Sequence, residues 1–94
     1  MGEVVSEDTV YIGEKPASVY TLRIMTLISK RAPRIVVKAR GREISKLALV
    51  CETVRRLTGG KVRYGRIELY SEQVGEPGRE KSVPALSVEI VPTE

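Results

Sequence analysis

Two stretches of the chain space their apolar residues as an amphipathic helix does. In residues 16–31, PASVYTLRIMTLISKR, the apolar positions cover more than one stripe, so we expect a first helix that begins at Pro16 and is largely buried. In residues 42–57, REISKLALVCETVRRL, one apolar face predicts a second helix, which the glycines at 59–60 end. The apolar positions of the first helix are Val19, Leu22, Ile24, Met25, Leu27 and Ile28, and the face of the second is made of Ile44, Leu47, Ala48, Cys51 and Val54.

The other apolar positions alternate with polar ones, which is the pattern of strands. The order β-α-β-α-β-β favours a parallel pair from the first strand-helix-strand unit and an antiparallel hairpin from the last two strands. We therefore predict an α+β fold, a two-layer sandwich in which a four-stranded mixed sheet carries both helices on one face. Residues 8–94 would form one domain after a flexible tail of residues 1–7. The four strands are expected at residues 9–12, 34–40, 61–73 and 82–91.

Glycines interrupt the alternation at informative places. In RIVVKAR, one parity carries aliphatic side chains for the core and the other displays Lys38 and Arg40, and Gly41 then ends the strand. The third strand changes phase at Gly65, which is typical of a β-bulge. The polar segment around residues 75–78 predicts the tip of a long hairpin that projects beyond the body of the domain.

Charge is segregated along the chain, although its sum over 94 residues is only +4. Residues 15–66 carry fourteen Lys and Arg against two Glu, whereas the segments before and after are net acidic. A positive field of this size repels itself, and its usual use is to attract a negative partner. We therefore favour a polyanion-binding face over an ordinary solvated surface.

The residue types that the chain lacks narrow its chemistry. Without histidine, Ser/His/Asp and Cys/His nucleophiles and His-containing metal sites are excluded. The single cysteine, Cys51, can form no intramolecular disulfide, and its place on the apolar face of a helix predicts a buried side chain. The glutamates at 68, 72, 76 and 80 lie in strand and loop, where a spacing of four gives no common face. We expect no enzyme, no cofactor and no bound metal.

The hydropathy pattern gives no sign of a membrane protein. The longest apolar run, residues 19–28, is interrupted by Arg23 and is too short to cross a bilayer. The first residues are acidic, whereas a secretion signal begins with basic residues. We expect a soluble cytoplasmic protein without a membrane partner.

The densest group of cations lies where the second strand passes into the second helix. KARGREISKLA places Lys38 and Arg40 on one side of the strand, and Arg42 and Lys46 at i and i+4 on one flank of the helix. Gly41 permits a tight turn, and the free N–H groups at the start of the helix add a partial positive charge. Because guanidinium groups suit bidentate phosphate contacts, this junction is a candidate phosphate cradle.

A second junction repeats this arrangement earlier in the chain. EKPAS places Lys15 in a loop after Gly13, just before the first helix. Two such junctions at the same end of two parallel strands would lie side by side and form a groove for a sugar-phosphate backbone. The second helix also carries apolar residues away from its main face, and a helix that is apolar on two sides predicts a contact with another subunit. These residues are Leu49, Val50 and Leu57.

The same residues carry a family resemblance. The segments VYIGEKPASVY, IVVKARGREISKLA and CETVRRL occur in an order and spacing that resembles the Alba family of small archaeal chromatin proteins, over roughly residues 8–92. The resemblance implies a fold similar to the C-terminal domain of translation initiation factor three. It also implies a homodimer that binds double-stranded DNA without sequence preference, often binds RNA, and is associated with the chromosome in the cytoplasm.

The resemblance further implies roles for individual residues. Lys15 and the group at Arg40, Arg42 and Lys46 would contact the phosphate backbone across the body of the dimer, and the hairpin tips would reach along the minor groove as arms. The dimer surface would combine the second helix and the hairpin strands, in agreement with the leftover apolar residues described above. The nucleic-acid-binding set is then Lys15, Lys38, Arg40, Arg42, Lys46, Arg79 and Lys81.

Two departures from the family pattern limit what the resemblance implies. Many members carry two adjacent lysines before the loop proline, one of them an acetylation target; here Glu14 replaces the first and Lys15 remains, so the resemblance does not carry over regulation by acetylation. Leu57 and Thr58 stand where cooperative members have an aromatic residue, so association between dimers is expected to be weaker or different. Three alternatives stay open from the sequence: an RNA-binding ribonucleoprotein subunit such as a ribonuclease P protein, a metal-dependent nuclease, and a scaffold for an acidic protein. A heterodimer with a paralogous chain also stays open.

Overall fold

The structure is a computed structural model, and it describes residues 8–93. The predicted tail, residues 1–7, and Glu94 lie outside the described residues. The predicted order of elements is confirmed, with one short 3-10 turn, η1, between the second strand and the second helix. The elements are β1 (Asp8–Tyr11), α1 (Ala17–Ser29), β2 (Ile35–Arg40), η1 (Gly41–Glu43), α2 (Ile44–Leu57), β3 (Val62–Val74) and β4 (Lys81–Pro92).

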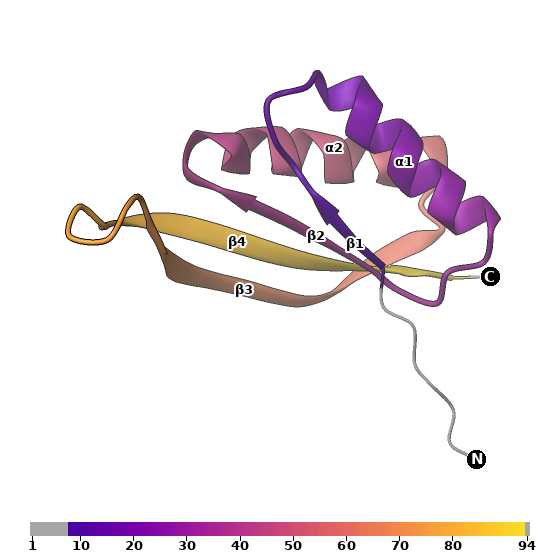
Figure 1. Ribbon diagram of the computed structural model, residues 1–94. Coiled ribbons are helices and arrows are strands. Elements are labelled where there is room, and N and C mark those ends of the chain that lie inside the picture. The colour runs from indigo at the N-terminus through magenta and orange to yellow at the C-terminus, as the bar shows by residue number, and fades with distance from the viewer. Residues whose placement is uncertain (1–7, 94) are drawn as a thin grey trace, which may run out of the picture.

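The four strands form one mixed sheet in the order β1-β2-β4-β3. β1 and β2 are parallel, whereas β4 is antiparallel to both of its neighbours, β2 and β3. Figure 1 shows both helices on the same side of this sheet, which leaves the opposite face open. The predicted two-layer α+β sandwich is therefore confirmed. We call the two sides the helix-covered face and the open face.

The core fills the space between the two helices and the helix-covered face. Because the strands alternate, one parity of β2 and β4 enters this core, as Val37 and Ile90 do. On α2, the buried stripe is shifted by part of a turn from the predicted one, so that Ala48 is exposed and Val50 is fully buried. At 100° per residue, Val50 lies closer to the line through Leu47 and Val54 than Ala48 does. The prediction of Val50 as a dimer contact is therefore wrong, because its side chain lies inside the core of the single chain.

Helix α1 is less buried than the apolar pattern predicts. Ile24 is fully buried and four of the other predicted positions are partly covered, but Leu22 is exposed. The helix also begins one residue later than predicted, because Pro16 has extended backbone angles and precedes it. It ends at Ser29, and Arg31 then turns the chain with a left-handed φ of 65°. Within the described residues, neither helix is long and apolar enough to cross a membrane.

The predicted bulge in β3 is confirmed by a shift in its register against β4 between Tyr64 and Ile67. The carboxylate of Glu89 on β4 accepts a hydrogen bond from the backbone N–H of Arg66 at 2.9 Å. A side chain at Gly65 would collide with that of Glu89, so glycine makes room for this contact. Beyond the bulge, the β3–β4 hairpin continues past the helices and projects from the body, as predicted (Figure 1).

Candidate nucleic-acid interface

The two cation-bearing junctions lie side by side. Because β1 and β2 are parallel neighbours, the segments that follow them leave the sheet at the same end. Lys46 on α2 links them directly: its Nζ donates to the carbonyl oxygen of Gly13 at 2.7 Å and to that of Lys15 at 2.8 Å. The loop between β1 and α1 is thus held against the first turns of α2, as expected for two adjacent junctions.

The same contacts occupy the ammonium group of Lys46. Besides the two carbonyl oxygens, Nζ forms an ion pair with Oε1 of Glu43 at 3.2 Å, and the Lys46 side chain is only 23% exposed. An ammonium group has three protons to donate, and here three oxygen atoms receive them. The sequence places Lys46 among the phosphate-binding cations, but in the structure its contacts hold the loop that carries Lys15.

Tyr20 supports the same loop from the side of the core. Its hydroxyl accepts a hydrogen bond from the backbone N–H of Lys15 at 3.2 Å, and Nζ of Lys46 lies 5.9 Å from the centre of its ring. The loop is also tight at Gly13, where an added Cβ would lie 3.2 Å from the Tyr20 hydroxyl. Tyr20 is buried, so it is a core residue and its ring is not available to stack on a base.

The turn after β2 presents its cations outward. Gly41 has a φ of +59°, a left-handed conformation that favours glycine, and it opens the 3-10 turn that precedes α2. Arg42 follows on this turn and is exposed, and its guanidinium has no ion pair or hydrogen bond within residues 8–93. The side chain of Lys15 is exposed as well. These two cations therefore stand free in solvent at the edge of the sheet, on two adjacent loops.

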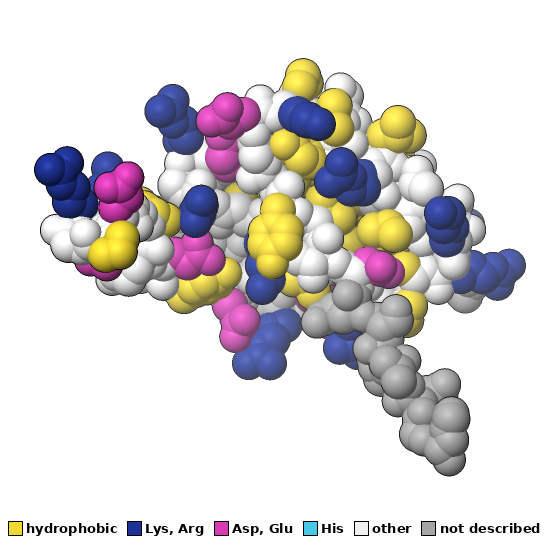
Figure 2. All heavy atoms as spheres, in the orientation of Figure 1, with side chains coloured by type: hydrophobic (Ala, Val, Ile, Leu, Met, Phe, Trp, Pro, Cys, Tyr) yellow, Lys and Arg dark blue, Asp and Glu magenta, His cyan; other side chains and the backbone are white. Residues whose placement is uncertain are grey.

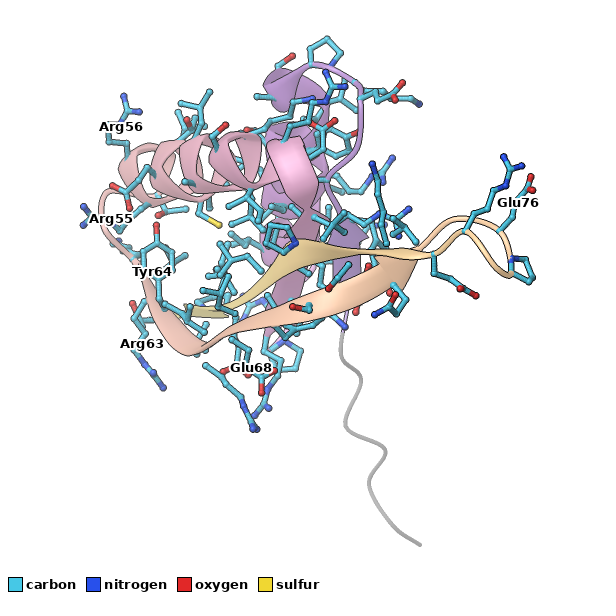
Figure 3. All side chains as sticks on the ribbon, turned by 90° about the vertical axis from the view of Figure 1, so that its left-hand side faces the viewer. Arg55, Arg56, Arg63, Tyr64, Glu68 and Glu76 are labelled. Atoms are coloured by element: carbon cyan, nitrogen blue, oxygen red, sulfur yellow. The ribbon has the colours of Figure 1, made fainter. Side chains whose placement is uncertain are left out.

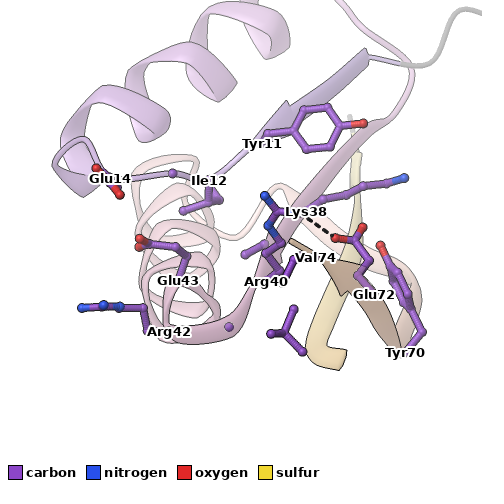
Figure 4. A pocket seen from close by; sticks show the side chains of 14 residues that line it. Tyr11, Ile12, Glu14, Lys38, Arg40, Arg42, Glu43, Tyr70, Glu72 and Val74 are labelled. Atoms are coloured by element: carbon purple, nitrogen blue, oxygen red, sulfur yellow. Dashed lines mark hydrogen bonds and ion pairs between the residues drawn. The ribbon is translucent and has the colours of Figure 1, made fainter. Parts of the chain in front are cut away.

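A cavity of about 650 Å³ lies between the junctions and the hairpin. It is lined by residues from both junctions, by the end of β2, and by β3 and β4 (Figure 4). Lys38, Arg40 and Arg42 all belong to its lining. Arg40 is partly neutralised there, because its Nη1 lies 3.3 Å from Oε1 of Glu72 on β3. The lining also contains three carboxylates, those of Glu14, Glu43 and Glu72. Glu72 pairs with Arg40 and Glu43 pairs with Lys46, whereas Lys38 and Arg42 have no ion pair within residues 8–93 and are available to phosphate groups.

The remaining two predicted cations, Arg79 and Lys81, do not line this cavity. Arg79 lies in the hairpin turn, where its backbone N–H donates to the carbonyl oxygen of Glu76 at 2.8 Å, and Lys81 is the first residue of β4. Figure 2 shows Lys and Arg side chains at the projecting end of the hairpin as well as over the body of the molecule. The structure thus separates the predicted cations into a group at the junctions and a pair on the hairpin.

Large aliphatic side chains remain uncovered on the helix-covered side. Leu49 and Leu57 on α2 are exposed, as their place away from the core stripe predicts. Two residues on β3 join them: Ile67 is 56% exposed and Leu69 is 74% exposed. Ile67 is opposite the buried Val88, so it lies on the helix-covered face beyond the reach of the helices. We call Leu49, Leu57, Ile67 and Leu69 the apolar surface. The alternation of β3 predicts which face Ile67 and Leu69 point to, but it does not predict that they are exposed.

A polar contact joins α2 to β3 and was not predicted from the sequence. The hydroxyl of Tyr64 donates to Oε2 of Glu52 at 2.6 Å, and Arg55 forms an ion pair with the same carboxylate at 3.2 Å. Figure 3 shows Tyr64 on β3 below Arg55 on α2. The hydrogen bond from Tyr64, followed by that from Arg55, holds the pKa of Glu52 below its ordinary value. Burial and the contact with Glu52 raise the pKa of Tyr64. Burial also raises the pKa of Cys51 to about 12, so this thiol stays protonated at neutral pH.

Comparisons with known proteins agree with this architecture. The family model described as Alba matches residues 8–71. The chain is 36% identical over 85 residues to a protein named DNA/RNA-binding protein Alba from Nanoarchaeum equitans, with 87% of this chain and 94% of that protein covered. It is also 36% identical over 87 residues to the protein of the same name from Pyrobaculum neutrophilum, covering 90% and 95%. Among solved structures, Alba from Thermoplasma volcanium superimposes with a TM-score of 0.84 at 27% identity, over 89% of this chain and 99% of that one.

Proposed function

This chain belongs to the Alba family, and we propose that it is a homodimeric nucleic-acid-binding protein that coats and compacts double-stranded DNA. In this proposal it binds the phosphate backbone without sequence preference, binds RNA through the same cations, and is associated with the chromosome. The names of its relatives, DNA/RNA-binding protein Alba, support the choice of ligand.

One observation carries the proposal: Lys38, Arg40 and Arg42 line a single cavity beside the loop of Lys15. Arginine can bind a phosphate group through two parallel hydrogen bonds, and lysine binds it as a point charge. Contacts of this kind fix the position of a nucleic acid but do not read its bases. Both helices pack on the sheet, and neither projects as an element that could enter a major groove (Figure 1). We therefore expect similar affinity for unrelated duplex sequences.

The apolar surface supports the dimer. A small domain that exposes large aliphatic side chains on α2 and on the helix-covered face of β3 has apolar surface that a second copy can bury. A two-fold axis through this surface would bring the cation-lined cavities of two subunits together in one extended track, with Arg79 and Lys81 of each hairpin at its ends. The same surface would also accept a paralogous chain, so a heterodimer follows the same chemistry.

Salt dependence tests the phosphate contacts. We expect the logarithm of affinity for duplex DNA to fall linearly with the logarithm of salt concentration, by about 0.9 for each phosphate neutralised. Arg42→Ala and Lys15→Ala should each weaken binding to two unrelated duplexes alike and reduce this slope by about one unit. Light scattering should find a dimer at the protein concentrations used. Affinity that does not change with salt, or a monomer that binds as tightly, would contradict the proposal.

A structured RNA of equal length, used as a competitor, measures which nucleic acid binds more tightly and tests the ribonucleoprotein alternative. The nuclease alternative has a separate test, which is incubation of labelled DNA and RNA with the protein and magnesium. Within residues 8–93, no group of three His, Cys, Asp or Glu lies close enough together to hold a metal ion. Full-length strands after prolonged incubation are the expected result, and cleavage that an acid-to-amide substitution abolishes would favour the nuclease.

A further inference from the structure

The four tyrosines of this chain have different environments. Tyr20 is buried in the core, and Tyr64 donates its hydroxyl proton to Glu52. The other two, Tyr11 at 66% exposed and Tyr70 at 36% exposed, have no hydrogen bond through their hydroxyls within residues 8–93. Both line the cavity that contains Lys38 and Arg40, as Figure 4 shows.

Strand register places these tyrosines on the open face with the cations. Tyr11 on β1 is opposite Lys38 on β2. Tyr70 on β3 is opposite Ala85 on β4, which in turn is opposite Arg40 on β2. Residues that are directly opposite one another in a sheet point to the same face. Two aromatic rings on the outer strands therefore flank two cations on an inner strand, on the side of the sheet that carries no helix (Figure 1).

Small residues separate the two rings. On β4, between β2 and β3, the open face carries Ala85 and Ser87, both buried at the base of the neighbouring side chains. Only small side chains therefore lie on β4 between Arg40 on β2 and the ring of Tyr70 on β3. Three strand spacings lie between β1 and β3, which is about 14 Å. At that separation each ring is a platform of its own, and the two do not clasp a single base.

We propose that the open face binds single-stranded nucleic acid, with unpaired bases stacked on Tyr11 and Tyr70 and with the phosphates between them on Lys38 and Arg40. This inference rests on the proposed function and adds to it a stacking site for unpaired bases on the open face. In a duplex the bases are already paired and stacked, so their faces are not available to the rings. In a single strand every base has a free face, and a basic groove with aromatic side chains is the common solution for binding such strands without sequence preference.

An ion pair with Glu72 fixes the position of Arg40 and partly neutralises it. It holds the guanidinium of Arg40 over the open face, on the same side as Tyr70. The strand preference of tyrosine explains why tyrosine is tolerated at positions 11 and 70. It does not explain why both exposed rings line one cavity with two cations, and a stacked ligand does.

Binding to three probes of equal length tests the proposal: a single strand of thymidine nucleotides, the same strand without bases, and a duplex. The strand without bases keeps the phosphates and removes the stacking. Tyr11→Leu and Tyr70→Leu should each weaken binding of the thymidine strand about tenfold. The same variants should weaken binding of the duplex and of the base-free strand far less, because these probes offer the rings no free base. Tyr11→Phe and Tyr70→Phe, which keep the rings, are the matched controls and should bind all three probes normally.

Photo-crosslinking gives a readout that needs no variant. A strand that carries 5-iodouracil in place of thymine should crosslink, on irradiation, to peptides that contain Tyr11 and Tyr70. Crosslinks that map only elsewhere would overturn the proposal, and so would equal affinity for the thymidine and base-free strands. If the duplex then still binds with the expected salt dependence, the proposed function stands and only the stacking site is lost. If none of the probes binds, both proposals fail.

Discussion

The two faces of the sheet differ in what they leave uncovered. On the helix-covered face, the aliphatic side chains of β2 and β4 are buried under the helices, but those of β3 extend beyond them and remain exposed. On the open face no helix packs, and the exposed groups are cations, tyrosine rings and the carboxylates of Glu68 and Glu72. The first face has unsatisfied apolar area, which a second copy can bury. The second face has charge and aromatic surface, which suit a nucleic acid.

This difference arises within single strands. Leu69 and Tyr70 are neighbours on β3, yet they lie on opposite faces because side chains alternate along a strand. The same is true of Val37 and Lys38 on β2. Substitutions at adjacent positions should therefore have separable effects, one on association between subunits and the other on nucleic acid. Variants on each face test whether the two faces are as independent as the alternation requires.

The largest effect is expected from Leu69→Glu on the apolar surface. Leu69 is 74% exposed in the single chain, so the substitution should not disturb the core. If a second copy covers this position, a carboxylate there would be buried without a partner. We expect the dimer dissociation constant to rise roughly a hundredfold. Analytical ultracentrifugation measures this, and the affinity for duplex DNA should fall with it because each monomer keeps only half of the track.

Gln73→Glu is the matched control for this change. Gln73 is on the same strand and points to the same face as Leu69, four residues further toward the projecting end of the hairpin. The substitution adds the same negative charge as Leu69→Glu. It should leave association unchanged. Equal loss of dimer in both variants would mean that net charge, and not burial at position 69, controls association, and the helix-covered face would lose its assigned role.

The second-largest effect concerns Lys46 and Arg42, which lie four residues apart where η1 passes into α2. The ammonium of Lys46 has three oxygen partners, whereas the guanidinium of Arg42 has none within residues 8–93. We expect Lys46→Met to lower the free energy of unfolding by about 1–2 kcal/mol, because several hydrogen bonds to the loop are lost. It should hardly change the salt slope of duplex binding. Arg42→Met should do the reverse, with unchanged stability and a slope reduced by about one unit.

Urea denaturation at one fixed protein concentration measures the stability of both variants, because the stability of a dimer depends on concentration. Lys46→Arg is a further control. It keeps the charge but replaces a compact ammonium with a planar fork that does not fit the same three oxygens. If Lys46→Met reduced the salt slope as strongly as Arg42→Met, Lys46 would be a phosphate ligand after all.

The pair of cations also shows how far the sequence could predict the site. Parallel strands correctly placed the loop of Lys15 beside the start of α2, where Lys46 is hydrogen-bonded to it. The predicted helix begins two residues later than expected, so Arg42 lies on the 3-10 turn before it and does not share a helix flank with Lys46. The availability of each cation could not be predicted, because it depends on which carbonyl oxygens a folded loop presents to it. Charge is a property of the sequence, whereas the partner of each charge is a property of tertiary structure.

The fold was more predictable than the details of its packing. The alternation of the strands and the glycine at position 65 were sufficient for the sheet and its bulge, since both follow from local geometry. The sequence did not predict which residues at the edges of the apolar helix stripes are buried, as Val50 and Leu22 show. A neighbouring element decides which flank of a helix is covered. The face on which Tyr70 lies could be predicted, because it is two residues from both Glu68 and Glu72 on the same strand. The sequence does not show, however, that Tyr11 lies across the sheet from Tyr70.

The smallest expected effect concerns the ion pair between Arg40 and Glu72, which crosses the cavity. Glu72→Gln removes the partner of Arg40 and should free its guanidinium for a phosphate. Both side chains are largely exposed, so the gain in affinity should be only about 0.5 kcal/mol. The salt slope should steepen by about one unit, because one more cation is available. Fluorescence anisotropy with labelled duplex, measured at several salt concentrations, resolves this change.

Asp8→Asn provides the same change in net charge at the opposite end of the sheet, where β1 begins. It should alter neither affinity nor slope beyond the general effect of one charge. If Glu72→Gln weakened binding, Glu72 would instead be a residue that orients Arg40 for binding. The single strand of thymidine nucleotides should then lose more affinity than the duplex. Either result assigns Glu72 to the open face, and an unchanged slope in both variants would mean that Arg40 makes no phosphate contact.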